Sequence, residues 1–234
     1  MIKVIGSSSA GNAVLYDKGK IMVDCGLPFK TVQPHLDKVK LVLLTHIHGD
    51  HFSPSTIATI CALYPKITWM VPNYMEKEFS ALKKPHTRVV ITKTSKEYVA
   101  GPYLIKVLPL FHDIPNVGYS IIINNGYKIV HATDTNMIRH LQDIKEYDLY
   151  AIECNYDENI IYDKIKGSLY DESYTYEISS RENHLSFQKT ISWFKEVRKE
   201  DSILYPLHVS HSYDDELVKV IMNRLLKPDH NIKE

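Results

Sequence analysis

Four potential metal ligands occur within the six residues 46–51, directly after the apolar segment Leu41–Leu44. His46 and His48 are two residues apart, so in an extended backbone their rings leave on the same side. Asp50 and His51 follow a glycine turn and can face a second ion. Two ions about 3.5–4 Å apart can hold a hydroxide and align an ester for attack. The other interpretation, a surface turn that is polar by chance, is weaker because the loop follows a buried strand and further potential ligands occur downstream.

Length and composition indicate an ordinary globular protein. We expect residues 1–234 to form a single domain, a length that one domain can have. The 28 basic and 28 acidic residues balance, which argues against coating nucleic acid by bulk charge but allows a nuclease with a local basic patch. No segment is apolar enough to span a bilayer or to act as a signal peptide, so we expect a cytoplasmic protein with no membrane partner. The scattered Cys25, Cys61 and Cys154 are expected to be buried, reduced thiols.

Short apolar runs alternate with helical patterns along the chain. The predicted strands are Ile2–Ile5, Ala13–Tyr16, Lys20–Asp24, Leu41–Thr45, Ile67–Val71, Arg88–Thr92, Glu97–Val99, Tyr103–Leu108, Gly118–Ile123, Tyr127–Ala132, Leu149–Glu153 and Ser202–Leu207. The predicted helices are Phe29–Leu36, Pro54–Leu63, Pro72–Leu82, Thr135–Asp143, Asp157–Lys166, Ser186–Arg198 and Asp214–Leu226. This order predicts an α/β fold in which two mixed β-sheets pack together with helices outside, an αββα sandwich.

Further candidate ligands stand at the ends of later strands. His112 follows the apolar run at residues 107–111, and we favour a ligand over an ordinary loop histidine. Asp134 follows the strand that begins at Tyr127, and its two carboxylate oxygens could bridge both ions. The other interpretation of Asp134 is a helix N-cap, but Thr133 or Thr135 could serve that role instead.

One of two histidines should complete the second ion. His208 ends the last predicted strand and is favoured over His211, which lies three residues further on. His184 lies in a polar loop before a helix. It could act as a general acid that protonates a leaving alkoxide, or it could be a loop histidine with a structural hydrogen bond; we favour the general acid.

In this order the residues resemble the metallo-β-lactamase superfamily, and the resemblance covers essentially the whole chain. Asp50 beside His51, and Asp134 between two threonines, look like its phosphodiesterase and nuclease branch. Four segments resemble the YycJ/WalJ group of that branch: Gly6–Asn12, Asp24–Gly26, Glu153–Asn155 and Asn183–Ser186. Related groups are RNase Z, the PhnP-type phosphodiesterases and the phage anti-Pycsar enzymes that open cyclic nucleotides. The inserted arm of RNase Z is absent from this sequence, and the chain is too short for the second domain of RNase J.

The resemblance implies a two-metal site. In the expected arrangement His46, His48 and His112 bind one ion, Asp50, His51 and His208 bind the other, and Asp134 bridges them. The cofactors are two divalent ions, of which Zn²⁺ fits the histidines best and Mn²⁺ fits the added carboxylates. Asp50 and His184 are the expected catalytic residues, with His184 assisting proton transfer.

The expected function is hydrolysis of a nucleotide phosphodiester by a hydroxide that the two metals activate. Neutral charge mildly favours a small substrate such as a cyclic nucleotide. The alternatives are a single-strand DNA or RNA exonuclease of the YycJ type, a thioester or lactam hydrolase, and a metal-binding regulator without turnover. Ser7, Ser8, Ser9 and Asn12 either hydrogen-bond near the metals or only form a tight turn. The seven tyrosines between Tyr147 and Tyr176 could stack on a base, although packing or contact in a homodimer is expected for most of them.

Overall fold

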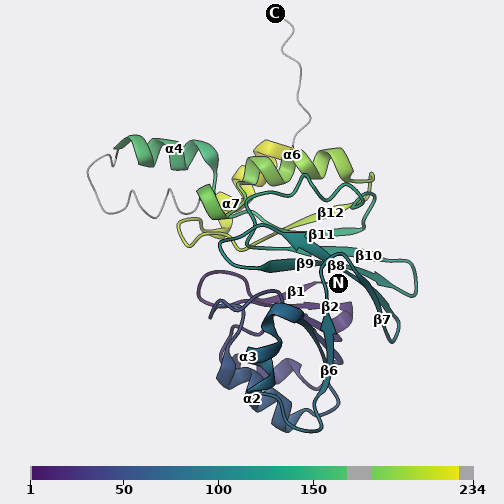
Figure 1. Ribbon diagram of the computed structural model, residues 1–234. Helices are drawn as coiled ribbons and strands as arrows, with labels where there is room; N and C mark the ends of the chain where they lie inside the picture. Colours follow the sequence, from purple (N-terminus) through teal and green to yellow (C-terminus); the bar gives the residue numbers. More distant parts are fainter. Residues whose placement is uncertain (1, 168–180, 227–234) are drawn as a thin grey trace, which may run out of the picture.

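Two six-stranded β-sheets pack face to face in a computed structural model of the protein, which describes residues 2–167 and 181–226 (Figure 1). The strands of the first sheet, in spatial order, are β1 (Lys3–Gly6), β2 (Ala13–Tyr16), β3 (Ile21–Val23), β4 (Leu41–Leu43), β5 (Thr68–Pro72) and β6 (Arg88–Thr92). The first three strands pair antiparallel and the last four pair parallel, so this sheet is mixed.

The second sheet is also mixed. Its strands, in spatial order, are β12 (Ile203–Leu207), β11 (Leu149–Glu153), β10 (Lys128–Ala132), β9 (Asn116–Ile123), β8 (Tyr103–Leu110) and β7 (Glu97–Ala100). Strands β10, β11 and β12 pair parallel, and the remaining pairs are antiparallel. In the turn between β9 and β10, Gly126 has a φ of +84°, a conformation that favours glycine.

Alternation of side chains along the strands separates the core between the sheets from the core under the helices. On β4, Leu41 and Leu43 face the second sheet, whereas Val42 packs under helices. On β2, Val14 and Tyr16 likewise face inward. Every second residue of these strands meets a different apolar layer, as expected for strands buried on both faces. The predicted αββα sandwich is confirmed.

Helices cover the outer face of each sheet (Figure 1). Those on the first sheet are α1 (Phe29–Val32), α2 (Pro54–Leu63) and α3 (Glu76–Ser80); those on the side of the second sheet are α4 (Glu158–Gly167), α6 (Phe187–Val197) and α7 (Asp215–Leu226). Short 3₁₀ turns occupy Asp17–Gly19, Gln33–His35 and Asn73–Met75. Helix α6 begins after an N-cap, Ser186, whose hydroxyl accepts from the Lys189 amide. Its apolar stripe of Ile191, Phe194 and Val197 is buried.

Two predicted helices are wrong or shortened. Residues Thr135–Asp143 form turns instead of a helix. The Thr135 amide donates to Glu153 and the Asn136 amide donates to the Phe111 carbonyl. Further on, the Leu141 amide bonds three residues back and the Gln142 amide two residues back, which are turn bonds and not the four-residue bonds of an α-helix. Pro72 does not open a helix either, because it ends β5 with an extended ψ of 141°, and α3 begins only at Glu76.

Burial in the structure agrees with the expectations for the cysteines and for most of the described tyrosines. Cys25, Cys61 and Cys154 are free and buried, as predicted. Tyr147, Tyr150 and Tyr156 are buried, whereas Tyr162 is 53% exposed. The other tyrosines for which stacking or packing was expected, Tyr170, Tyr174 and Tyr176, lie outside the described residues. Packing therefore accounts for Tyr147 and Tyr150.

Among the described residues, none of the helices combines the length and the apolar character that crossing a membrane requires.

Truncating Phe194 to alanine should lower the free energy of unfolding by about 3–5 kcal/mol, because the ring is 2% exposed and fills the space between α6 and the second sheet. Urea denaturation of the metal-free protein measures this loss. Glu196→Ala on the exposed side of α6 is the control and should cost at most about 1 kcal/mol, since it removes only a surface ion pair with Arg139. Equal stability of the two variants would contradict the packing described here.

Candidate metal centre

A buried carboxylate holds the ligand loop that follows β4. Asp24 accepts hydrogen bonds from the amide and the hydroxyl of Thr45, each at 2.9 Å. Its other oxygen lies 2.6 Å from Nδ1 of His51. The Asp24 side chain is 2% exposed and that of His51 is fully buried, so this pair fixes the direction of the His51 ring without help from solvent. The other ring nitrogen of His51, Nε2, lies 3.0 Å from Oδ2 of Asp134.

The loop also rests against the segment before β2. The Asn12 side-chain amide lies 3.2 Å from Oδ2 of Asp50 and 2.9 Å from Nε2 of His51. Ser7 accepts from the backbone amide of His208 at 2.8 Å, whereas Ser8 makes only local turn bonds. Of the two interpretations of the Ser-rich segment, contact with the site therefore holds for Ser7 and Asn12, and the tight turn holds for Ser8.

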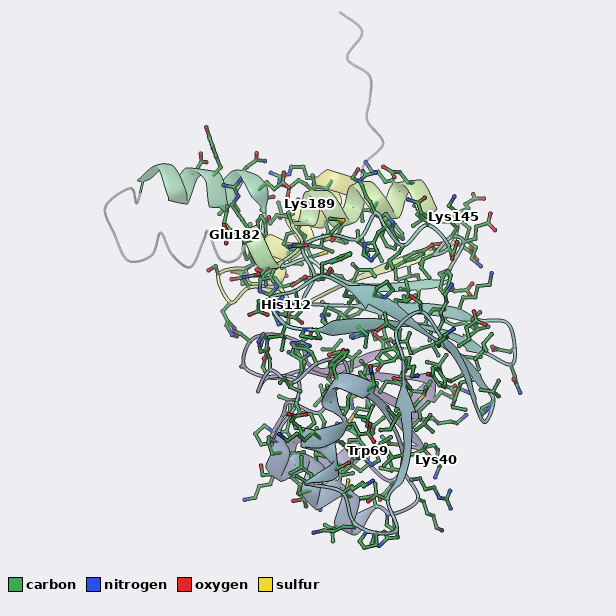
Figure 2. All side chains as sticks on the ribbon, in the orientation of Figure 1. Lys40, Trp69, His112, Lys145, Glu182 and Lys189 are labelled. Atoms are coloured by element: carbon green, nitrogen blue, oxygen red, sulfur yellow. The ribbon has the colours of Figure 1, made fainter. Side chains whose placement is uncertain are left out.

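Ligand candidates from the second sheet follow the ends of its strands. His112 comes two residues after β8, Asp134 two residues after β10, and His208 directly after β12. Figure 2 shows His112 at one edge of the sandwich, between the two layers. Asp134 and His208 have φ values of 55° and 50°, a left-handed conformation that costs free energy in residues other than glycine. The backbone therefore accepts strain where it turns these side chains toward the first sheet.

The predicted ligands meet in overlapping groups. Within each group the candidate ligand atoms lie within 4.8 Å of one another. The groups are His46 with His48 and His112; Asp50 with His51 and His208; His46 with His51 and Asp134; and Asp134 with Glu153, His184 and His208. Asp134 belongs to the last two groups. Its carboxylate also lies 4.0 Å from Nε2 of His112 in the first group and 3.0 Å from Nε2 of His51 in the second, so it lies between the first two groups.

Several ring nitrogens of this cluster have no hydrogen-bond partner within residues 2–167 and 181–226. They are Nε2 of His46, Nδ1 of His112 and Nε2 of His208, all buried. A buried polar atom without a partner is costly, and an imidazole nitrogen whose neighbours are other imidazoles and carboxylates suits a metal ion. The donor set of the described residues therefore fits divalent cations.

The carboxylates of the cluster create a field that favours positive charge. Burial alone would lower the pKa of His208, but Asp134, Asp50 and Glu153 raise it to about 10. Burial would raise the pKa of Asp134, yet the charges of His51 and His208 hold it well below its usual value. In contrast, burial and the charge of His51 lower the pKa of His46 to about 2, so this ring stays neutral and able to coordinate.

A carboxylate–histidine pair borders the cluster. Oε1 of Glu153 lies 2.5 Å from Nδ1 of His184 and 3.4 Å from Nδ1 of His208. Oε2 accepts from the backbone amides of Thr135 and Leu185, so the fully buried carboxylate is held on both oxygens. The His184 ring stacks on that of His208 with centroids 5.3 Å apart. Burial would lower the pKa of His184, but the charge and hydrogen bond of Glu153 raise it.

The structure brings together every site residue that the sequence predicts. His211 is exposed and belongs to none of the groups, which agrees with the choice of His208. Asp134 caps no helix, because turns follow it. Sequence reasoning missed the roles of Asp24 and Glu153, which it noted only as parts of family-like segments. Both stand at the ends of buried strands, the same signal that pointed to Asp134.

Comparison with known proteins places the fold in a family. A family model described as a β-lactamase superfamily domain matches residues 20–209. A metal-dependent hydrolase of Pyrococcus abyssi is 28% identical over 149 residues, 56% of this chain and 62% of that protein. An exodeoxyribonuclease YycJ of Bacillus anthracis is 26% identical over 176 residues, covering 68% of this chain and 64% of the other. A ribonuclease Z of Clostridium novyi is 26% identical over 147 residues, 51% of this chain and 47% of the enzyme. The chain thus spans between about half and two thirds of the length of these relatives.

Solved structures show the same fold over nearly the whole chain. The metallo-β-lactamase fold protein YhfI from Bacillus subtilis has a TM-score of 0.74 at 18% identity, covering 97% of this chain and 92% of that one. The short form of human tRNase Z has a TM-score of 0.68 at 19% identity, covering 91% of this chain and 93% of that one. A diphosphatase of the PhnP family has a TM-score of 0.66 at 13% identity, covering 92% of this chain and 88% of that one.

Gly26→Ala should weaken metal binding, because a Cβ at Gly26 would lie 1.7 Å from the backbone oxygen of Asp50 and must displace the ligand loop. The matched control is Gly49→Ala in the same loop, where an added Cβ meets nothing within 4 Å. Zinc retained per chain after dialysis against a weak chelator measures the effect. We expect roughly 10- to 100-fold weaker binding for Gly26→Ala, as for other changes that displace ligands indirectly. Equal zinc retention by both variants would contradict the close approach of the two loops.

Proposed function

Since the chain belongs to the metallo-β-lactamase superfamily, we propose that it is a metal-dependent phosphodiesterase that hydrolyses nucleotide phosphodiester bonds. The observation that carries the proposal is the position of Asp134, whose carboxylate lies 4.0 Å from His112 of one ligand group and 3.0 Å from His51 of the other. Buried ring nitrogens of His46, His112 and His208 lack hydrogen-bond partners among the described residues. Two adjacent cations suit the chemistry of a phosphodiester, because both attacking and leaving oxygens need stabilisation.

In the proposed arrangement the ligands divide between two ions. His46, His48 and His112 would hold the first, Asp50, His51 and His208 would hold the second, and Asp134 would contribute to both. Zn²⁺ is the favoured ion and Mn²⁺ the alternative. Bound divalent ions would activate water and neutralise the charge that develops on the phosphoryl oxygens. Asp24 orients His51 and thereby its coordinating nitrogen, in the way that a second carboxylate commonly supports a ligating histidine.

His184 is the proposed general acid. Its Nδ1 faces Glu153, so the carboxylate fixes the ring and stabilises its protonated form. The remaining nitrogen, Nε2, is then the one available to give a proton to a leaving alkoxide. His184 is 19% exposed, compared with 5% or less for His51, His112 and His208, which leaves it accessible to a substrate.

The names of two relatives support a nucleotide substrate. One is a ribonuclease and the other an exodeoxyribonuclease, and both align over less than two thirds of their own length. A cyclic nucleotide and a single strand are both phosphodiesters, so both are candidate substrates of the proposed reaction. A thioester or lactam substrate is the weaker candidate, since the Glu153–His184 pair can supply the proton that an alkoxide leaving group needs.

A hydrolysis screen tests the proposal. The chain is loaded with zinc or manganese and offered bis-p-nitrophenyl phosphate, cyclic mononucleotides, single-stranded oligonucleotides and an acyl thioester. We expect turnover of at least one phosphodiester that a chelator abolishes and added metal restores. Hydrolysis of the thioester alone, or of nothing at all, would overturn the assignment.

Asp134→Ala should reduce phosphodiesterase turnover by roughly a hundredfold or more, because the variant loses the shared carboxylate of both metal positions. Metal analysis should show less than the wild-type content, and circular dichroism should show an intact fold. The control is Asp143→Ala, which removes an exposed carboxylate paired with Lys106 at the surface. Wild-type turnover of Asp134→Ala would defeat the bridging role.

Glu153→Gln should lower kcat roughly 10- to 100-fold with the metal content retained, because the neutral amide no longer supports the charged form of His184. His184→Ala should show a loss of similar size. Since the two residues act through one proton, the double variant should be hardly worse than either single one. If the losses of kcat in the two single variants add up in the double variant, Glu153 does not act through His184.

A further inference from the structure

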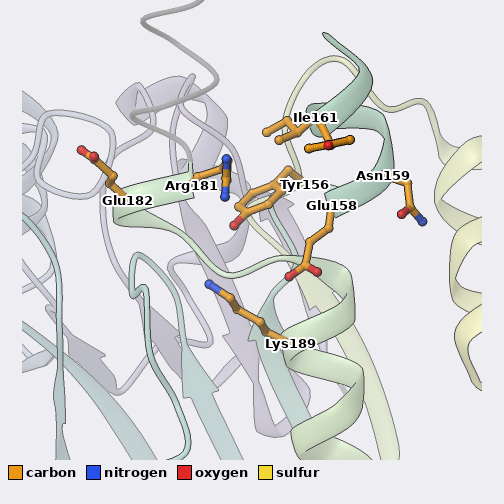
Figure 3. A pocket seen from close by; sticks show the side chains of 8 residues that line it. Tyr156, Glu158, Asn159, Ile161, Arg181, Glu182 and Lys189 are labelled. Atoms are coloured by element: carbon orange, nitrogen blue, oxygen red, sulfur yellow. The ribbon is translucent and has the colours of Figure 1, made fainter. Parts of the chain in front are cut away.

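A cavity of 680 Å³ lies beside the candidate metal centre, between the first turns of α4 and α6 (Figure 3). Its lining residues are Tyr156, Glu158, Asn159, Ile161, Tyr162, Arg181, Glu182 and Lys189. Two chain segments connect it to the site, one running from Glu153 to Tyr156 and the other from His184 to Lys189. The hydrogen bond from Asn136 to the Glu182 carbonyl, at 2.8 Å, ties its rim to the loop that carries Asp134.

This cavity is lined by hydrogen-bond donors that have no acceptor among residues 2–167 and 181–226. Neither the Arg181 guanidinium nor the Lys189 ammonium has an ion pair or a hydrogen bond among the described residues. The Tyr156 hydroxyl also lacks a partner among them, although the residue is only 3% exposed. Burial and the charge of Glu158 raise the pKa of Tyr156 to about 12, so its hydroxyl keeps its proton and can donate. In Figure 3 the Arg181 and Lys189 side chains lie on either side of the Tyr156 ring.

Among the described residues, neither lining carboxylate forms an ion pair with Arg181 or Lys189. Glu158 accepts a hydrogen bond from the Ser186 hydroxyl at 2.7 Å, which holds it at the start of α6. The Glu182 side chain points away from Tyr156 in Figure 3. An anion with several acceptor oxygens would satisfy the two cations and the phenol together, which is the recognition chemistry of a phosphate group.

The rest of the lining suits the remainder of a nucleotide. Ile161 and Tyr162 supply an apolar and an aromatic surface beside the donors, and the cavity has the volume of a typical small-molecule site. Bases stack on such aromatic side chains in proteins that bind single strands. The combination of phosphate donors with an aromatic wall distinguishes this cavity from a simple anion site.

We propose that this cavity binds the nucleotide next to the scissile phosphodiester, with its phosphate on Arg181, Lys189 and the Tyr156 hydroxyl. The inference rests on the proposed phosphodiesterase function and names its substrate class as a linear nucleotide chain with at least one further phosphate. A cyclic mononucleotide has a single phosphate, and once that group is at the metal centre none is left for Arg181. The cavity therefore selects linear substrates over cyclic ones.

Kinetics on dinucleotides test the selection. The metal-loaded chain is offered ApA, which has only the scissile phosphate, and pApA and ApAp, which add a terminal one. We expect kcat/KM for one phosphorylated form to exceed that for ApA by roughly 10- to 100-fold, since hydrogen bonds to charged groups contribute most of this preference. Arg181→Ala combined with Lys189→Ala should bring the ratio close to one, and Tyr156→Phe should lower it partly. A ratio unchanged by the double variant would overturn the proposal.

The matched control is Lys145→Ala, which removes an exposed lysine at the opposite end of the same layer (Figure 2). It should keep the wild-type ratio. Loss of the preference in Lys145→Ala as well would show that general surface charge, and not the cavity, attracts the phosphorylated substrate.

Calorimetry on the full chain in chelator separates this proposal from the proposed function. AMP should bind more tightly than either inorganic phosphate or adenosine, and the double variant should weaken AMP binding at least roughly tenfold. AMP that binds no better than inorganic phosphate would reduce the cavity to an anion site and overturn the inference. If no phosphodiester is hydrolysed, the proposed function fails, whereas the AMP measurement still decides whether the cavity binds a nucleotide.

Discussion

The candidate centre depends on the contact between Asp24 and His51. This pair is buried, and the same carboxylate takes two hydrogen bonds from Thr45. One side chain thus joins the end of β3, the end of β4 and the far side of the ligand loop. An ion pair without solvent is stable only when its other hydrogen bonds are satisfied, and here Thr45 supplies them. The direction of His51, and through it the approach of Asp134, follows from this arrangement.

Much of the fold could be predicted because the relevant signals are local. The strands alternate or run apolar over short stretches, and their order along the chain specifies two mixed sheets between helices. The cluster of candidate ligands was also predictable, since His46 to His51 lie close in sequence. His112, Asp134 and His208 each follow the end of an apolar strand, and strand ends in such a sandwich gather at one edge.

The sequence was least informative where distant residues compete for the same backbone groups. The segment after Asp134 has the composition of a helix, yet Glu153 and Phe111 take the hydrogen bonds of its first amides. Glu153 itself was missed because a carboxylate at a strand end has many ordinary explanations, and only the 2.5 Å contact with His184 reveals its partner. The cavity lined by Arg181 and Lys189 depends on the spacing of α4 and α6, which no local pattern encodes.

The donor groups of the centre come from both halves of the chain, with His46 to His51 after β4 of one sheet and His208 after the last strand of the other. During synthesis a ribosome releases the first set long before the last. The final donor, His208, follows β12, which is placed in the sheet by its parallel pairing with β11. A truncated product that ends before β12 would therefore lack His208 and emerge with an incomplete set of candidate ligands.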